Sequence, residues 1–416
     1  MYQTPQQLET AIRDAVESVQ ILDLHTHIVP PSFGKLMLWG IDELLTYHYL
    51  IAEVFRLAPD ALTCDDFFRM PTAAQADLIW KTLFVDRSPL SEACRGVITT
   101  IAKLGLDPNE RDLNTIRKAF AARTPAEHVD HVFETAGVHT AIMTNNPCDP
   151  LEIPCWESNR QRDPRFQAAL RIDDLLLFLP RTAPQLKKQG YDIAGDLAGQ
   201  SLAEIRRFLS DWIDRIDPWY VAASVGPDFD YPGTDHNRRL LDEAILPICR
   251  DRGLPLALMA GVKRAVNPRL ALAGDGVGRS DPDFVARLCD ENPDNKFLIT
   301  MLARESQHEL VVVARKFRNL HIFGCWWFLN NPSLIREITA QRIEMLGLSF
   351  TPQHSDARIL DQIIYKWTHS RRIIADVLVE QYTNLFNVGY RPTPDEINAT
   401  VTDLFGGAFK AFLNRP

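Results

Sequence analysis

The chain has 416 residues, of which 46% are hydrophobic and 24% are charged, so it has ample material for a globular core. Its formal net charge is −9 and it has no basic cluster, which argues against nucleic acid or an anionic membrane as a partner. No apolar run reaches membrane-spanning length, and the seven cysteines are scattered without a CxxC pair. We therefore expect a cytoplasmic protein with reduced thiols.

The first residues predict an amphipathic helix rather than a signal peptide, because Leu8, Ile12 and Val16 recur at helical spacing. A strand is predicted at 20–27, and the next one only after roughly a hundred residues, far more than an ordinary strand-to-helix connection. The intervening segment predicts four helices, at 36–56, 73–84, 90–105 and 112–122. We expect a helical insertion at about 34–136, mounted on a single domain that covers 1–416.

Later in the chain, short apolar strands alternate with amphipathic helices. Eight strands are predicted in all, at 20–27, 139–145, 166–172, 219–225, 254–262, 296–302, 320–328 and 348–356. The intervening helices are predicted at 202–216, 237–249, 281–291, 308–317 and 333–346. This alternation indicates a parallel sheet covered by helices, and eight units favour an α/β fold of the closed (β/α)₈ TIM-barrel type. A doubly wound sheet is the alternative, but no GxGxxG opens any of the units.

The first candidate site is in "ILDLHTH", the first predicted strand. Side chains alternate along a strand, so Asp23, His25 and His27 are expected on one face, which in a barrel is the interior. Neutral imidazoles at a strand end can hold a divalent metal. Two hydrogen-bonded histidines without a metal would explain the same pattern.

The second candidate is "PQHSDAR" at the end of the eighth predicted strand. In a closed barrel the first and last strands are neighbours, so Asp356 can reach a metal held by His25 and His27, as a ligand, a proton acceptor or both. A helix N-cap is an alternative role for Asp356, and the two are compatible. Arg358 is a cation suited to a substrate carboxylate or oxyanion, or else a solvated arginine.

Three further segments carry candidates whose ordinary structural roles are also open. His48 and Tyr49 lie in "TYHYL", where amphipathic packing is the alternative. Arg171 follows the third predicted strand and suits an anionic substrate, or an ion pair with a neighbouring aspartate. Trp326 in "FGCWWFLNNP" is suited to walling a sugar ring, or to the core.

Taken together, these segments resemble the uronate isomerase family of the amidohydrolase superfamily. The resemblance covers nearly the whole chain and rests on an ordered set of motifs: "DLHTHI", "LLTYHYLIAEVFR", "AALRID", "FGCWWFLNNP" and "PQHSDARILDQIIYKW". It implies a (β/α)₈ barrel with its active site at the C-terminal face. The implied reactions convert D-glucuronate to D-fructuronate and D-galacturonate to D-tagaturonate.

The resemblance also implies a metal site and a sugar site. One divalent metal, usually zinc and less indispensable than in hydrolytic relatives, would be held by His25, His27 and Asp356. The sugar site would be lined by His48, Tyr49, Arg171, Trp326, Asp356 and Arg358. The chain departs from some members in having Met259 where they carry a histidine in the fifth strand. We therefore expect open coordination positions and weak metal affinity, and, without a strand lysine suited to a carbamate, at most one metal.

Isomerisation moves a hydrogen from C2 to C1, so it needs a base near C2 and donors or cations for the enediolate oxygens. Our hypothesis makes Asp356 the general acid/base. Tyr49 and His48 relay protons and stabilise the enediolate, while Arg358 adds positive charge.

Substrate binding is assigned to Arg171, for the C6 carboxylate, and to Trp326, for the ring. The rival hypotheses are a metal-dependent hydrolase, lactonase or decarboxylase on the same barrel, and a non-catalytic uronate-binding barrel. In each case the expected partner is a small-molecule hexuronate rather than nucleic acid or a membrane. We expect a homo-oligomer, as is common for large cytoplasmic enzymes.

Overall fold

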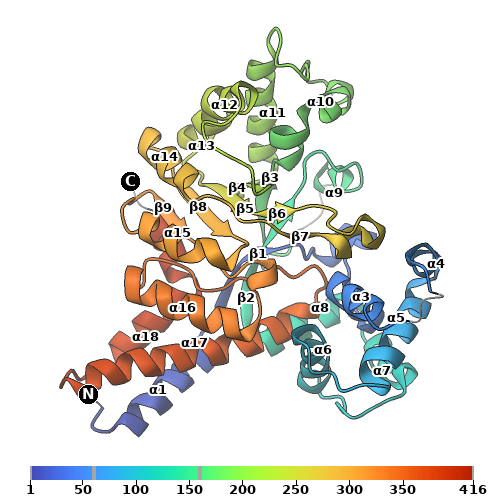
Figure 1. Cartoon of the computed structure of the whole chain (residues 1–416), viewed down its shortest axis with the longest axis vertical. Coiled ribbons are helices and arrows are strands. Elements are labelled where there is room, and N and C mark those ends of the chain that lie inside the picture. Colours follow the sequence, from blue (N-terminus) through green and yellow to red (C-terminus); the bar gives the residue numbers. More distant parts are fainter. Residues whose placement is uncertain (1, 59–61, 158–161, 415–416) are drawn as a thin grey trace.

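The computed structural model describes residues 2–58, 62–157 and 162–414. The chain begins with α1 (Pro5–Ser18), where the Thr4 hydroxyl accepts a hydrogen bond from the Gln7 amide as an N-cap. The helix buries Leu8, Ile12 and Val16, which confirms the predicted amphipathic face. It packs along the long helix α17 (Gln362–Asn387), at the lower left of Figure 1.

A parallel sheet of seven strands forms the centre of the described chain. Its order is β1 (Ile21–Thr26), β2 (Val138–Asn145), β3 (Phe166–Arg171), β4 (Pro218–Val225), β5 (Leu256–Ala260), β8 (Phe297–Met301) and β9 (Leu320–Ile322). Helices cover its outer face (Figure 1): α8 (Pro125–Ala136), α10 (Asp173–Lys188), α11 (Ser201–Ile216), α13 (Leu246–Asp251), α14 (Asp283–Glu291), α15 (Gln307–Ala314), α16 (Pro332–Leu346) and α17. Alternate residues of each strand therefore pack outward on helices or inward on one another.

The segment predicted as the eighth strand, 348–356, does not form a continuous strand. Thr351 pairs with Phe323 in a single bridge, and its amide donates to the Ile322 carbonyl at 3.0 Å. On the other side, the Asp356 amide donates to the His25 carbonyl at 3.0 Å, and the His27 amide to the Ala357 carbonyl at 2.7 Å. The segment thus closes the (β/α)₈ ring between β9 and β1 through a few backbone hydrogen bonds, without a regular ladder.

The prediction that Asp23 shares the barrel-facing side with the histidines is wrong. Leu22 and Leu24 belong to the apolar cluster inside the barrel, and Asp23 instead accepts a 2.8 Å hydrogen bond from the indole of Trp367 on α17. The pairing of β1 with β2 shifts register between Asp23 and Thr26. This irregularity interrupts the alternation, so that His25 also turns inward.

Between β1 and β2 lies a series of helices, drawn in blue to cyan at the lower right of Figure 1. They are η1 (Pro31–Leu36), α2 (Ile41–Leu45), α3 (His48–Phe55), α4 (Cys64–Arg69), α5 (Thr72–Trp80), η2 (Lys81–Val85), α6 (Glu92–Lys103) and α7 (Leu113–Ala121). Residues 59–61 of the expected insertion lie outside the described part. Helix α6 packs closely on α17 at Gly96, where a Cβ would lie only 2.7 Å from the Tyr365 ring.

A second excursion follows β5. It contains the antiparallel pair β6 (Val262–Lys263) and β7 (Gly276–Val277), joined through η4 (Pro268–Gly274), and it contacts α3 and α4.

The remaining helices are α9 (Ile153–Glu157), α12 (Asp235–Leu240), η3 (Leu241–Ile245), η5 (Arg304–Ser306), η6 (Trp327–Leu329), α18 (Pro394–Thr402), η7 (Asp403–Gly407) and α19 (Ala408–Leu413). In the described part of the chain, no helix combines the length and apolar character needed to cross a membrane.

Candidate active site

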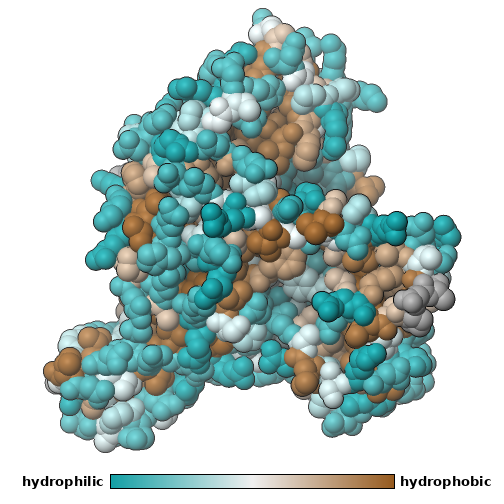
Figure 2. Space-filling view, in the orientation of Figure 1, coloured by the Kyte–Doolittle hydropathy of each residue, from teal (hydrophilic) through white to brown (hydrophobic). Residues whose placement is uncertain are grey.

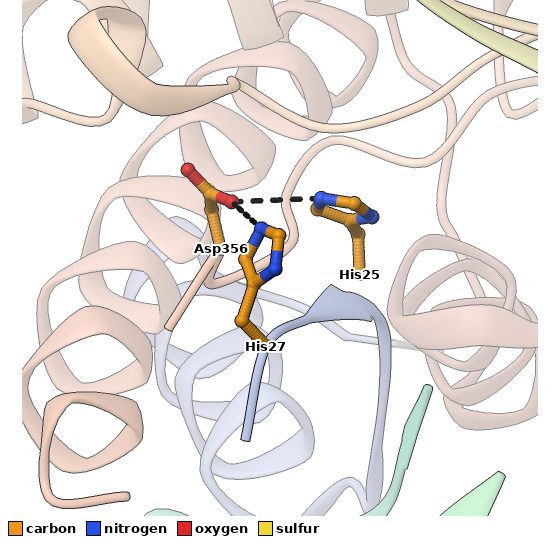
Figure 3. Close-up of side chains that lie close together, drawn as sticks. All are labelled: His25, His27 and Asp356. Carbon is orange, nitrogen blue, oxygen red and sulfur yellow. Dashed lines mark ion pairs between the residues drawn. The ribbon is translucent and has the colours of Figure 1, made fainter. Parts of the chain in front are cut away.

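His25, His27 and Asp356 converge where β1 meets the closing segment. The His27 Nε2 atom lies 3.3 Å from Asp356 Oδ1, and the His25 Nε2 atom lies 3.5 Å from the same oxygen. Figure 3 shows both imidazoles turned toward the carboxylate. His25 is fully buried and Asp356 is 6% exposed, whereas the side chain of His27 is 16% exposed and faces the barrel mouth. Asp356 has a left-handed backbone (φ 51°), a conformation that aspartate tolerates better than most residues.

Each histidine is oriented by a hydroxyl group. The Tyr220 hydroxyl donates to the Leu24 carbonyl at 2.7 Å and lies 3.3 Å from His25 Nδ1. The Thr144 hydroxyl donates to the Thr26 carbonyl at 2.8 Å and lies 2.9 Å from His27 Nδ1. Since each hydroxyl has a single hydrogen, already given to a carbonyl, each Nδ1 must carry the proton. Both Nε2 atoms then present lone pairs toward Asp356.

The three ligand atoms fit a metal ion. They lie within 4.8 Å of one another, and His25 Nε2 and Asp356 Oδ1 are buried without a hydrogen-bond partner. A buried carboxylate facing two nitrogen lone pairs requires a positive partner, and a divalent cation would provide one without protonating either imidazole.

A cavity of about 330 Å³ opens beside this cluster. Its polar lining consists of His27, Glu43, Thr46, Tyr47, His48 and Arg358. Its other walls are largely apolar side chains from α3, α4 and η4, together with Leu38 and Ile359. In Figure 2, hydrophobic residues gather around the hollow between the insertion helices and the excursion after β5. The guanidinium of Arg358 has no ion-pair partner among the described residues, so its charge is available to a ligand. The volume is at the lower end of the range typical of small-molecule sites.

His48 and Tyr49 lie at the start of α3, with their ring centroids 4.7 Å apart. Burial and the nearby charge of Arg358 lower the pKa of His48 to about 3, so its imidazole is neutral at physiological pH. Its Nε2 atom is buried without a partner. Burial raises the pKa of Tyr49 well above its ordinary value, so the phenol keeps its proton.

The two remaining candidates lie deeper or are already paired. Arg171 binds Asp173 through two hydrogen bonds, from Nε at 2.8 Å and from Nη2 at 3.0 Å. The ion pair considered from the sequence is therefore present, and Nη1 is the part of the guanidinium left outside it. Trp326 is buried in the barrel cluster beside Trp327, at 5.9 Å between ring centroids. The described lining of the cavity includes the candidates His27, His48 and Arg358, but not His25, Tyr49, Arg171, Trp326 or Asp356.

Several residues near the site were not identified from the sequence. Tyr220 and Thr144 orient the histidines, and Trp327 lies 5.7 Å from His48 between ring centroids. Trp327 has φ 48°, and its indole nitrogen is buried without a partner. Lys366 lies beneath Tyr49, with its Nζ atom 5.6 Å from the ring centroid. Thr144 lies at the carboxyl end of β2, where barrel sites form, and that position was a signal the sequence offered. Tyr220 lies near the start of β4 and Trp327 begins η6, so neither had this signal.

The fold and this cluster define an enzyme of the (β/α)₈ barrel class with a site suited to a metal at the C-terminal ends of its strands. A crystal structure of a uronate isomerase from Bacillus halodurans C-125 is 48% identical in sequence, with a TM-score of 0.97 over 100% of this chain and 98% of that one. The chain therefore belongs to the uronate isomerase family. No protein-family model and no curated protein matches it.

Two more distant crystal structures share the fold. A uronate isomerase from Thermotoga maritima is 14% identical, with a TM-score of 0.77 over 99% of this chain and 100% of that one. A glucuronate isomerase from Caulobacter crescentus is 16% identical, with a TM-score of 0.78 over 99% of this chain and 95% of that one. The barrel and its additions are thus retained at low sequence identity.

Proposed function

We propose that this protein is an aldose–ketose isomerase that converts D-glucuronate to D-fructuronate and D-galacturonate to D-tagaturonate. The observation that carries the proposal is the 48% identity to a uronate isomerase along essentially the full length of both chains. The His25, His27 and Asp356 cluster beside a cavity with a free arginine supports it, because an anionic sugar needs a cationic anchor and a proton acceptor.

Asp356 is the proposed general acid/base. In its ionised form the carboxylate can accept the C2 proton and return it to C1. Its backbone is anchored by the hydrogen bond from its amide to the His25 carbonyl. The acid/base group is thereby held at the mouth of the barrel, next to the cavity.

His48 and Tyr49 are the proposed partners in proton relay and enediolate stabilisation. A neutral imidazole can accept or donate a proton, and a phenol that keeps its hydrogen can donate a hydrogen bond to a developing oxyanion. Arg358 would add positive charge at the same oxygens. Arg171, through its unpaired edge, is proposed for the C6 carboxylate, and Trp326 for a wall near the ring.

One divalent metal, proposed as zinc, would be held by His25 Nε2, His27 Nε2 and an Asp356 oxygen. When bound, the ion would supply a positive charge that polarises a substrate oxygen. Met259, in β5, is buried among apolar side chains inside the barrel. Two histidines and one aspartate therefore form the proposed ligand set, with open coordination positions and weak affinity.

We further infer a cytoplasmic homo-oligomer that binds neither nucleic acid nor a membrane. The net charge of −9 and the seven free cysteines support this assignment.

The test is to incubate the protein with D-glucuronate in deuterated solvent and to identify the product by NMR. Fructuronate with deuterium at C1 is expected, because a proton that passes through an enediol exchanges with solvent. Fructuronate without deuterium would still show isomerase activity. The hydrogen would then move by a hydride shift, or as a proton shielded from exchange with solvent. The absence of a ketose from both glucuronate and galacturonate would overturn the proposal, and carbon dioxide release or lactone hydrolysis would favour a rival.

A further inference from the structure

Lys366 is a buried lysine that the proposed chemistry does not use. Its side chain, on the second turn of α17, is 3% exposed, and its Nζ atom lies 3.4 Å from Glu92 Oε1 on α6. Lysine is rarely buried to this degree unless it is paired. The pair joins a barrel helix to an insertion helix, so its geometry depends on how these two parts of the chain pack.

The ammonium group of Lys366 lies against aromatic side chains. Its Nζ atom is 5.6 Å from the Tyr49 ring centroid and 5.1 Å from the Tyr365 ring centroid, within the range of cation–π attraction. The same charge reaches His48, where it adds to burial and Arg358 in keeping the imidazole neutral. Lys366 therefore directly contacts one member of the proposed relay, Tyr49.

Neither Lys366 nor Tyr49 is among the described lining residues of the cavity beside Asp356. Lys366 contacts Glu92 and Tyr49, so it would act on substrate through these neighbours. We propose that Lys366, paired with Glu92, is a positioning residue for the isomerisation, because its ammonium group holds the Tyr49 ring in place. This inference rests on the proposed function. Displacement of a catalytic group by about 1 Å can cost about 100-fold in rate, so the contribution is measurable.

The experiment compares the unmodified protein with Lys366→Met and a matched control, His128→Gln. His128 also links the insertion segment to the barrel, since its Nε2 atom lies 2.6 Å from Asp361 Oδ1 and both residues are fully buried. Lys366→Met should lower kcat about 100-fold with KM nearly unchanged. His128→Gln should lower the melting temperature while kcat is retained. Equal kcat in Lys366→Met and the unmodified protein, or equal losses in both variants, would overturn the inference.

A rescue experiment separates charge from packing and stays informative if Lys366→Met folds poorly. A cavity of about 310 Å³ is lined by Glu92, Gly96 and Tyr365, so it reaches the carboxylate of the pair, and we expect a small amine to enter through it. In Lys366→Ala, n-propylammonium replaces the missing part of the side chain and should restore kcat saturably, whereas the same concentration of sodium should not. Lack of rescue would assign Lys366 a packing role and overturn the inference. A lack of turnover by the unmodified protein would overturn the proposed function and this inference together.

Discussion

His25 and His27 are each held by a hydroxyl whose hydrogen is already committed to a backbone carbonyl. This arrangement assigns the Nδ1 proton and turns both Nε2 lone pairs toward Asp356. Hydrogen-bond partners of this kind raise the affinity of the site for its metal, because they fix the tautomer and the ring orientation of each histidine. The proposed metal site therefore includes Tyr220 and Thr144 as well as the three ligands.

Replacing Tyr220 by Phe tests this arrangement. We expect metal affinity to fall about 10–100-fold, because His25 Nδ1–H loses its acceptor and the ring can turn. Chelator competition would measure the affinity. Tyr231→Phe is the matched control, since it removes a buried hydroxyl that bonds Asp242 and lies outside the cluster. Unchanged affinity in Tyr220→Phe would show that the ring is held by other contacts.

Asp356→Asn tests the proposed acid/base. Asparagine also tolerates the left-handed backbone at this position, so the fold should survive. Turnover should fall about 10²–10⁴-fold, because the amide cannot accept the C2 proton. Steady-state kinetics, with circular dichroism as the control for folding, would measure this, and near-normal turnover would remove Asp356 from the mechanism.

At the scale of elements, closure of the barrel depends on an irregular segment and on Gly324. The Gly324 amide donates to the Thr351 carbonyl at 2.8 Å, directly after β9. Its φ is +71°, and a Cβ there would lie 1.9 Å from His354 Cδ2. Glycine is required because both the backbone conformation and the close approach of His354 exclude a side chain.

Gly324→Ala should therefore destabilise the protein far more than an equivalent change in open space. Gly347 has φ +61°, and no atom lies within 4 Å of the place that a Cβ would take there, so Gly347→Ala is the matched control. We expect the control to cost about 1–3 kcal/mol, for its unusual backbone conformation (φ 61°, ψ −116°) alone. Gly324→Ala should exceed about 4 kcal/mol in the free energy of unfolding, measured by urea denaturation. Equal costs would mean that His354 can move aside.

At the scale of the whole molecule, neutral buried histidines make stability depend on pH. Burial, with the charges of Lys366, Arg372 and Arg95, lowers the pKa of His369 to about 3. The unfolded chain has an ordinary pKa near 6.5, so between about pH 3 and 6.5 it binds more protons than the native state. This contribution to stability is present above pH 6.5 and is lost as the pH falls.

His369→Gln should reduce this dependence. Between pH 7 and pH 5 the single histidine accounts for about 2 kcal/mol of lost stability, and the glutamine variant should lack that part. Urea denaturation at the two pH values would give the free energies of unfolding. If the free energy of unfolding falls equally in the variant and the unmodified protein between pH 7 and pH 5, His369 binds its proton in the native state as readily as in the unfolded chain.

Most of the barrel could be predicted, because apolar strands and amphipathic helices carry their periodicity locally. The first seven predicted strands correspond to β1–β5, β8 and β9, although the seventh ends at Ile322 rather than at 328. His25, His27 and Asp356 could be brought together from the sequence because the first and last segments of a barrel are neighbours. The roles of these residues stay predictions, as do those of the other candidates.

The sequence by itself determined the barrel class, the helical segment after the first strand and the residue types that converge at its mouth, because these follow from local patterns and their order. Only the tertiary structure decided the inward turn of His25, the outward turn of Asp23 and the place of Lys366 beneath Tyr49. These features depend on a register shift between strands and on contacts between segments hundreds of residues apart. Neither leaves a local pattern, because the free energy that selects them arises only when the segments pack together.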